Sequence, residues 1–167
     1  GESNAVVFCN SVLGARTNRY GDFLDIACAI AGRAPDYGLH REENRRATLV
    51  VDVSDLSQAL RGAEVFYPVL GALLGREAGS EIAVIDGLQG LPDEDRLKAL
   101  GAAAASAGGV GLFHVAGMTP EAPNLSTALG GQAPERVVTV TPERIADELA
   151  RLSTSGTRDQ VDAVAIG

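Results

Sequence analysis

A chain of 167 residues with 46% hydrophobic side chains is long enough to form one domain around a substantial core. Its 22 acidic and 14 basic side chains give a net charge of −8, which argues against a nucleic-acid partner, because phosphate binding needs clustered lysines and arginines. No apolar run approaches the roughly 20 residues that cross a bilayer, and no signal peptide is recognisable, so no membrane partner is expected and the cytoplasm is the expected location. Cys9 and Cys28 lack CxxC or CxH spacing, so no disulfide framework is indicated.

The first apolar run, residues 5–9 (AVVFC), predicts a short strand buried on both faces. A polar loop, NSVLGARTNRYGD, follows this run and leads into a helical pattern. The predicted helix has an apolar face formed by Phe23, Leu24, Ile26, Ala27 and Ile30. A strand that leads through such a loop into a helix is a common way for α/β proteins to build a ligand site, so we expect the other segments to form a scaffold around this junction.

Further strands are predicted from apolar runs at residues 48–53, 81–86, 110–115, 136–140 and 161–166. Helical patterns lie between these runs, and local signals mark where several helices begin. Ser54 is a good cap for a helix from Asp55, Pro68 marks a break or a first turn, and Thr141-Pro142 begins the last helix. The segment at residues 33–46, RAPDYGLHREENRR, has no periodicity and is a long connection for this class of protein.

Six strands that alternate with helical stretches predict an α/β fold, namely a three-layer, doubly wound, mostly parallel sheet of about six strands. We expect one α/β domain over residues 1–167, and the missing initial methionine predicts that it comes from a longer multidomain chain. Ligands of such sheets bind beyond the carboxyl ends of the strands, so the segments after each strand are the candidate site. These segments are residues 10–18, 52–55, 86–90 and 116–123.

Arg16 is the candidate that favours ligand binding in the first of these segments. An arginine near the expected start of a helix can clamp a carboxylate or phosphate through two hydrogen bonds, while the helix N-terminus adds partial positive charge. Asn10, Ser11, Thr17 and Asn18 are either turn formers and a helix cap or hydrogen-bond donors to the same ligand. The glycine-rich fingerprints GxGxxG and GxxxxGK[ST] are absent, so nothing supports nucleotide binding.

Other candidates have two interpretations each. Cys9 is either a small buried thiol or one ligand of a metal or cluster whose other ligands lie elsewhere. His40 is either a loop residue or a general acid or base, and His114 is either a core histidine or a residue at the same strand ends. Asp52 and Asp86 fit helix capping and loop closure.

Two stretches resemble a known family. The first is VVFCNSVLGARTNRYGDFLDIACAIAGRAPDYGLHREENR, and the second is the later GLFHVAGMTPEAPNLSTALGG. Both are similar to the large-subunit region of the aconitase X family of hydro-lyases, and the resemblance covers essentially the whole chain. It implies an aconitase-superfamily-like domain of a dehydratase with an iron or iron-sulfur cluster, completed here by ligands outside this chain. It also implies partners, namely the remaining domains of the large portion and a small swivelling domain or subunit.

The resemblance further implies a small carboxylate substrate. The bacterial type of this family dehydrates cis-3-hydroxy-L-proline to Δ1-pyrroline-2-carboxylate, and the archaeal type acts on mevalonate 5-phosphate; the Cys9 form here is more similar to the bacterial type. The expected metal ligand is Cys9, and the catalytic base is not assigned. The expected substrate-binding residues are Asn10, Ser11, Gly14, Ala15, Arg16, Thr17, Asn18 and His40. The alternatives are an interdomain scaffold and a small-anion-binding module, both without catalysis.

Overall fold

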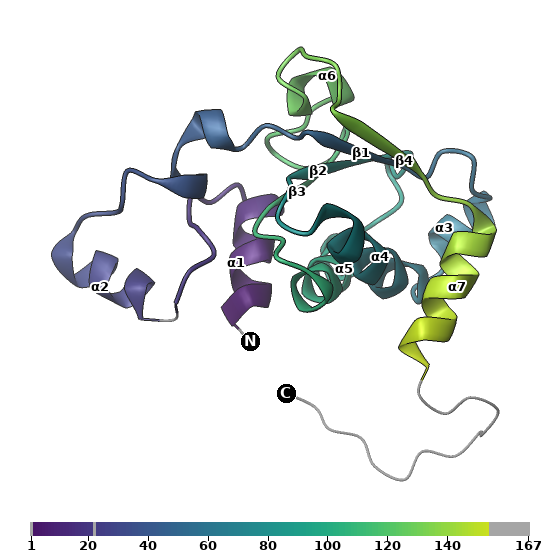
Figure 1. Cartoon of the computed structure of the whole chain (residues 1–167), viewed down its shortest axis with the longest axis horizontal. Helices are drawn as coiled ribbons and strands as arrows, with labels where there is room; N and C mark the ends of the chain where they lie inside the picture. Colours follow the sequence, from purple (N-terminus) through teal and green to yellow (C-terminus); the bar gives the residue numbers. More distant parts are fainter. Residues whose placement is uncertain (1, 22, 154–167) are drawn as a thin grey trace, which may run out of the picture.

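The structure is a computed structural model that describes residues 2–21 and 23–153, and a parallel sheet lies at its centre (Figure 1). The four strands of this sheet are β1 (Leu49–Asp52), β2 (Ala83–Asp86), β3 (Phe113–Val115) and β4 (Arg136–Thr139). They lie in the order β3-β2-β1-β4, and all neighbouring pairs are parallel. The chain therefore moves outward from β1 to β2 and β3, and then returns to the other side of β1, which confirms the doubly wound α/β prediction.

One face of the sheet carries most of the helices: α3 (Gln58–Gly62), α4 (Phe66–Ala78), α5 (Glu94–Ala107) and α7 (Pro142–Leu152). The larger hydrophobic core lies between these helices and the sheet, and 10 of the 13 residues of α4 are buried. Helices α4 and α5 approach closely because α4 carries glycine at the contact. A Cβ built on Gly71 would lie 2.2 Å from the carbonyl oxygen of Leu100, so no larger residue fits there without movement.

The opposite face of the sheet carries a thin layer formed by the short helix α6 (Leu125–Ala128) and its flanking loops. A second, smaller core joins this layer to the sheet. Its buried members are Ala47, Val50, Val84, Ala116, Ala122, Ala128 and Leu129. The fold thus has the predicted three layers, although the second helical layer is reduced to a single turn.

The first element is a helix, α1 (Glu2–Ser11), so the predicted strand at residues 5–9 was wrong. Its buried residues are Val6, Val7, Asn10 and Ser11, which fall on one face at helical spacing, and this face packs on α5 and β3. Valine and phenylalanine raise strand propensity, but packing decides the outcome for a short apolar run. The junction that follows is therefore helix, loop, helix.

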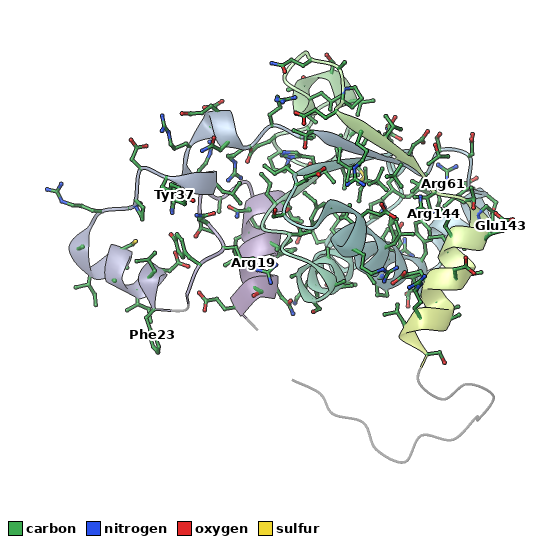
Figure 2. All side chains as sticks on the ribbon, in the orientation of Figure 1. Arg19, Phe23, Tyr37, Arg61, Glu143 and Arg144 are labelled. Atoms are coloured by element: carbon green, nitrogen blue, oxygen red, sulfur yellow. The ribbon has the colours of Figure 1, made fainter. Side chains whose placement is uncertain are left out.

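Residues 12–44 form a segment, called the arm below, that extends away from the sheet and its helices (Figure 1). It contains α2 (Leu24–Ala31) and two short 3₁₀ helices, η1 (Gly38–His40) and η2 (Glu42–Asn44). The predicted helix is confirmed, but α2 has no buried residue over Leu24–Ala31. Phe23 and Ile30 are 81% and 83% exposed, and Figure 2 shows Phe23 pointing away from the rest of the chain.

Two further differences from the sequence predictions concern the ends of elements. The described residues contain four strands rather than six, because residues 5–9 are helical and residues 161–166 lie outside the described part. The helix after β1 begins at Gln58 with Ser57 as its cap, since Ser54 instead donates to the carboxylate of Asp52. The Thr141 cap and first-turn Pro142 of α7 are confirmed. Within residues 2–21 and 23–153, no helix has the length and hydropathy needed to cross a membrane.

Candidate functional site

The loop after α1 turns at Gly14 and carries Arg16 to the thin layer of the fold. Gly14 has a φ of 70°, a conformation that favours glycine, and a Cβ there would lie 3.3 Å from Pro120. The amide of Ala15 donates to the carbonyl of Cys9 at 2.9 Å, so this turn is closed on the end of α1. Arg16 therefore follows a helix C-terminus, and the expected contribution of a helix N-terminus is wrong because α2 begins only at Leu24.

Arg16 lines a cavity of about 340 Å³ between the arm and the thin layer. Prolines 120 and 123 form part of its wall. The charged and titratable residues of the wall are Arg16, Glu42, Arg45, Arg46, Glu121 and His114. Three arginines against two glutamates give this wall a formal charge of +1, although the chain as a whole carries −8. Arg46 pairs with Glu135 outside the wall, so the cavity is a charge-rich site rather than a strongly positive one, of a size suited to a small charged ligand.

Arg16 itself is available to a ligand. Its side chain is 42% exposed, and within the described residues it forms one ion pair, with Glu42 at 3.7 Å, where the glutamate is 87% exposed. An exposed pair at that distance contributes little free energy, so a ligand carboxylate can replace Glu42 at low cost.

Arg45 joins the arm to the cavity wall, and its side chain is only 2% exposed. Its Nε donates to both carboxylate oxygens of Glu121 at 3.0 and 2.8 Å. Its terminal nitrogens donate to the carbonyl oxygens of Leu39 at 2.7 Å and Ala15 at 3.1 Å. One buried guanidinium therefore fixes the Arg16 loop, the η1 segment and the loop after β3 relative to one another.

Burial alone would raise the pKa of Glu121, but the hydrogen bonds and charge of Arg45 outweigh it and hold the pKa below its usual range. The nearby charge of Arg16 acts in the same direction, as does that of His114 when its ring is protonated. Glu121 is therefore an anion in the cavity wall at neutral pH.

His114 lies on β3 and is 2% exposed. Its Nε2 lies 2.8 Å from the carbonyl oxygen of Arg45, and since a carbonyl only accepts, Nε2 carries the proton. Burial lowers the pKa of His114, so the neutral ring is favoured. In the described part of the chain, Nδ1 is buried without a hydrogen-bond partner, which leaves one acceptor unsatisfied in a residue of the cavity wall.

Asn10 and Ser11 lie at the end of α1 and bond to protein groups. The Asn10 amide donates to the Gly111 carbonyl at 3.0 Å, and its oxygen accepts from the Thr17 amide at 3.0 Å. The Ser11 hydroxyl accepts from the amide of Phe113 at 3.0 Å. These bonds attach α1 and the Arg16 loop to the start of β3. Asn10 and Ser11 therefore hold the loop that carries Arg16 in position.

Thr17, Asn18 and Arg19 continue the loop away from the cavity of Arg16. The Thr17 hydroxyl donates to Asp25 at 3.1 Å, and Asn18 accepts from the Leu39 amide at 3.4 Å. Arg19 donates to the carbonyl oxygens of Ala105, Gly108 and Val110 at 2.7–3.1 Å. Since Ala105 and Gly108 lie at the end of α5, Arg19 is a cationic cap of that helix.

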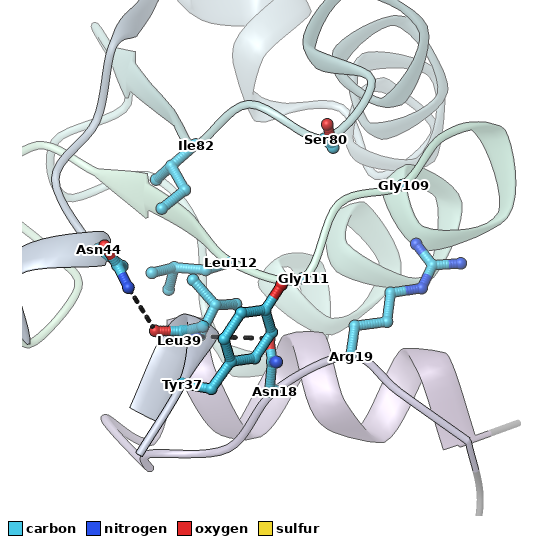
Figure 3. A pocket seen from close by; sticks show the side chains of 11 residues that line it. Asn18, Arg19, Tyr37, Leu39, Asn44, Ser80, Ile82, Gly109, Gly111 and Leu112 are labelled. Carbon is cyan, nitrogen blue, oxygen red and sulfur yellow. Dashed lines mark hydrogen bonds between the residues drawn. The ribbon is translucent and has the colours of Figure 1, made fainter. Parts of the chain in front are cut away.

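Asn18 and Arg19 also line a second cavity of about 420 Å³, which lies between the arm and the segments that precede β2 and β3 (Figure 3). Ser80 and Ile82 border it from one side, and Tyr37 borders it from the arm. The Arg19 guanidinium already donates to three carbonyl groups. It is therefore less available to a ligand in this cavity than Arg16 is in the other cavity.

His40 lies in the arm and pairs with Tyr20. The Tyr20 hydroxyl is 2.6 Å from Nε2 of His40, the two rings stack, and the Asp25 carboxylate lies 3.3 Å from the same hydroxyl. Neither His40 nor Tyr20 lines the cavity at Arg16. The structure thus brings Arg16 together with Glu121 and His114, and separates it from His40.

The described residues do not form a complete metal site. Within residues 2–21 and 23–153, no group of three or more histidine, cysteine or acidic side chains is close enough to hold a metal ion. Cys9 and Cys28 are free, partly buried thiols. Cys9 can therefore supply at most one ligand, and an iron or iron-sulfur centre does not fit the described residues on their own.

Sequence reasoning did not single out Arg45 and Glu121, the partly buried ion pair of the cavity wall. Arg45 is one of several arginines in an aperiodic connection, and Glu121 lies 76 positions away from it. The only available signal for Glu121 was its place after a predicted strand, in the segment 116–123. Arg45 gave no such signal, because its carboxylate partner Glu121 and the Ala15 carbonyl lie on distant segments.

Comparison with known proteins identifies the family. The sequence model of the aconitase X second domain matches residues 47–150, and that of the aconitase X first domain matches residues 1–43. The chain belongs to the aconitase X family. It is 50% identical to cis-3-hydroxy-L-proline dehydratase of Pseudomonas aeruginosa over 99% of its length, and 45% identical to the phosphomevalonate dehydratase large subunit of Methanothermobacter thermautotrophicus over the same share.

A solved aconitase X structure has the same fold. The holo-form of aconitase X from Thermococcus kodakaraensis superposes with a TM-score of 0.73 at 37% identity, covering 87% of this chain and 35% of that one. The present chain spans 28% of the Pseudomonas relative and 39% of the Methanothermobacter relative. The two family models meet between residues 43 and 47, so the cavity at Arg16 lies where an aconitase X first domain meets a second domain.

Proposed function

We propose that this chain is part of an aconitase X dehydratase, a hydro-lyase, and that the cavity at Arg16 binds the carboxylate of its substrate. The family and the names of its relatives support the reaction class. The observation that supports the site is an accessible arginine, with one weak and exposed ion pair, in the wall of a small cavity. The higher identity to the Pseudomonas relative favours cis-3-hydroxy-L-proline as the substrate, and mevalonate 5-phosphate is the alternative.

Arg16 would serve this reaction by holding the substrate carboxylate through two charge-assisted hydrogen bonds. Removal of a proton next to that carboxylate builds up enolate-like charge, and a fixed cation stabilises such charge best where water is partly excluded. Arg45 would keep Arg16 in place, because it donates hydrogen bonds both to the Ala15 carbonyl next to Arg16 and to Glu121. Asn10, Ser11 and the Gly14 turn would position the same loop from the side of α1.

Arg16→Ala in the full-length enzyme tests this proposal. Loss of the clamp is expected to lower kcat/KM for cis-3-hydroxy-L-proline by roughly 100-fold or more. Arg33→Ala is the matched control, since Arg33 is an exposed arginine of the arm outside the cavity. Retained kcat/KM in Arg16→Ala would reject the clamp and favour an interdomain scaffold, and turnover of mevalonate 5-phosphate alone would assign the other substrate.

The family also implies iron, and Cys9 is the one residue that we predict as a ligand. The described residues supply no complete ligand set for iron. Cys9→Ala in the full-length enzyme is expected to lower the iron-to-protein ratio, whereas Cys28→Ala, the matched control on α2, leaves it unchanged. An unchanged ratio in Cys9→Ala would make Cys9 a packing residue. Placement in the cytoplasm and the partner domains remain predictions.

A further inference from the structure

We propose that the cavity at Arg16 recognises a small zwitterion, with Arg16 binding its carboxylate and Glu121 accepting a hydrogen bond from its ammonium group. The inference rests on the proposed function only for the choice of probe ligands, because binding of both charges is measured without turnover. It assigns Glu121 as the residue that selects amino acids over other hydroxy acids.

The first support is that Arg16 and Glu121 carry opposite charges but do not form an ion pair with each other. Arg16 pairs with Glu42 and not with Glu121 in the described part of the chain, although Arg16 is close enough to lower the pKa of Glu121. Both line the same cavity of about 340 Å³. A ligand whose cationic and anionic groups are a few bonds apart can therefore contact both walls at once.

The second support is the remaining bonding capacity of Glu121. Arg45 donates to both of its oxygens, and each carboxylate oxygen can accept more than one hydrogen bond. The Glu121 side chain is 23% exposed, whereas that of Arg45 is 2% exposed. Glu121 is therefore the member of this ion pair that a ligand can reach. Arg45 keeps Glu121 ionised and fixed in direction, which prepares it to accept from a cationic donor.

The third support is independent of charge. The Nδ1 of His114 is a buried acceptor without a partner in the described residues, and an unsatisfied buried acceptor costs free energy that a donor can recover. The ring lines the cavity, and its Nε2 proton is fixed by the Arg45 carbonyl. Two acceptors, Glu121 and His114, thus belong to the wall of a cavity whose accessible cation is Arg16.

A ligand with two anionic groups fits this wall less well. Its second anion would meet Glu121, since Arg46, the remaining arginine, is paired with Glu135 at 3.1 Å. Like charges that are partly removed from water repel strongly. The charge pattern therefore favours an amino acid over a dicarboxylate or a phosphorylated acid.

Calorimetry on the full-length protein with three probes tests the inference. L-proline carries both charges, (S)-tetrahydrofuran-2-carboxylate has the same ring size without the ammonium, and pyrrolidine lacks the carboxylate. The wild type is expected to bind L-proline about tenfold or more tightly than either analogue, because each analogue lacks one of the two charge-assisted hydrogen bonds. Equal binding of L-proline and (S)-tetrahydrofuran-2-carboxylate overturns the inference without any variant having to fold.

Variants then assign the residues. Glu121→Gln is expected to remove the preference for L-proline over (S)-tetrahydrofuran-2-carboxylate, and Arg16→Ala to weaken both. Glu81→Gln is the matched control, because Glu81 pairs with Arg136 outside the cavity. A preference that survives Glu121→Gln overturns the assignment. If the protein binds L-proline preferentially but does not dehydrate cis-3-hydroxy-L-proline, the proposed function is rejected and this inference stands.

Discussion

The arm and the sheet with its helices are stabilised by different kinds of interaction. The α4 helix buries 10 of its 13 residues between the sheet and its helical neighbours. The α2 helix of the arm is even more apolar in sequence but buries none of Leu24–Ala31. An amphipathic or apolar pattern therefore predicts that a helix forms, and only packing decides whether that helix contributes to a core.

Polar side chains attach the arm to the rest of the molecule instead. Arg19 binds the carbonyl groups at the end of α5, and Arg45 binds Glu121 together with the carbonyls of Ala15 and Leu39. The cavity at Arg16 lies along this polar junction. The geometry of the candidate site therefore depends on a few directed hydrogen bonds. Removing either arginine side chain leaves the buried groups that it binds without a hydrogen-bond donor.

The largest expected effect is that of Arg45→Ala. This substitution leaves Glu121 and two carbonyl groups without their donor, so the free energy of unfolding of the chain is expected to fall by about 3–5 kcal/mol. Denaturant titration measures the change. Arg41→Ala is the matched control in the arm, because its pairs with Asp36 and Glu43 are exposed and are expected to contribute at most about 1 kcal/mol. Equal effects of the two variants would contradict a polar attachment.

Leu70→Ala and Ile30→Ala compare the two regions with the same kind of truncation. Leu70 is fully buried on α4, so its truncation is expected to cost about 2–5 kcal/mol. Ile30 is 83% exposed on α2, and its truncation is expected to change the free energy of unfolding by less than about 0.5 kcal/mol. A similar loss from both variants, measured by thermal and denaturant unfolding, would mean that α2 is packed in solution.

Gly71→Ala probes the tightest contact between helices. The added methyl group would lie 2.2 Å from the Leu100 carbonyl oxygen, so α4 and α5 must separate, at an expected cost of about 1–3 kcal/mol. Gly62→Ala on α3 is the control, since a Cβ at Gly62 meets nothing within 4 Å. Alanine favours helix there, and unchanged or slightly raised stability is expected. A neutral Gly71→Ala would show that the two helices can move apart freely.

The sequence predicted the sheet well because its strands are continuous apolar runs with clear ends. Residues 48–53 and 81–86 both contain a strand that ends in aspartate, as β1 and β2 do. The same rule failed for residues 5–9, since a run of that length occurs equally in a buried helix face. Glu2 near the start and buried polar residues at Asn10 and Ser11 are features of α1 that a strand model does not explain.

The candidate site was predictable only in part. Arg16 could be chosen because an arginine in a polar loop after an apolar run can bind a carboxylate or phosphate. The structure places it in the wall of a cavity. Its companions could not be chosen, because Arg45 and Glu121 are 76 positions apart and Arg45 and His114 are 69 apart. Nothing local in the sequence distinguishes a buried arginine from an exposed one, and long-range polar pairing carries no periodic pattern.

The smallest expected effect is a pH dependence that originates at this junction. Burial lowers the pKa of His114 in the folded chain, so between that pKa and the ordinary value near 6.5 the unfolded chain binds a proton that the folded chain does not. The free energy of unfolding is therefore expected to fall as the pH drops below about 6.5, by at most about 1.4 kcal/mol per pH unit for one proton. Glu121, whose folded pKa is lowered, adds a separate loss only as the pH falls below the unfolded carboxyl value of 4.5.

His114→Gln separates these two ranges. Glutamine can still donate to the Arg45 carbonyl but does not titrate, so the loss of stability that begins near pH 6.5 is expected to disappear while the loss below 4.5 remains. Chemical unfolding between pH 4 and 8 measures both. If the variant keeps the full wild-type slope above pH 5, the proton is taken up elsewhere and His114 is not the neutral, buried acceptor that the cavity requires.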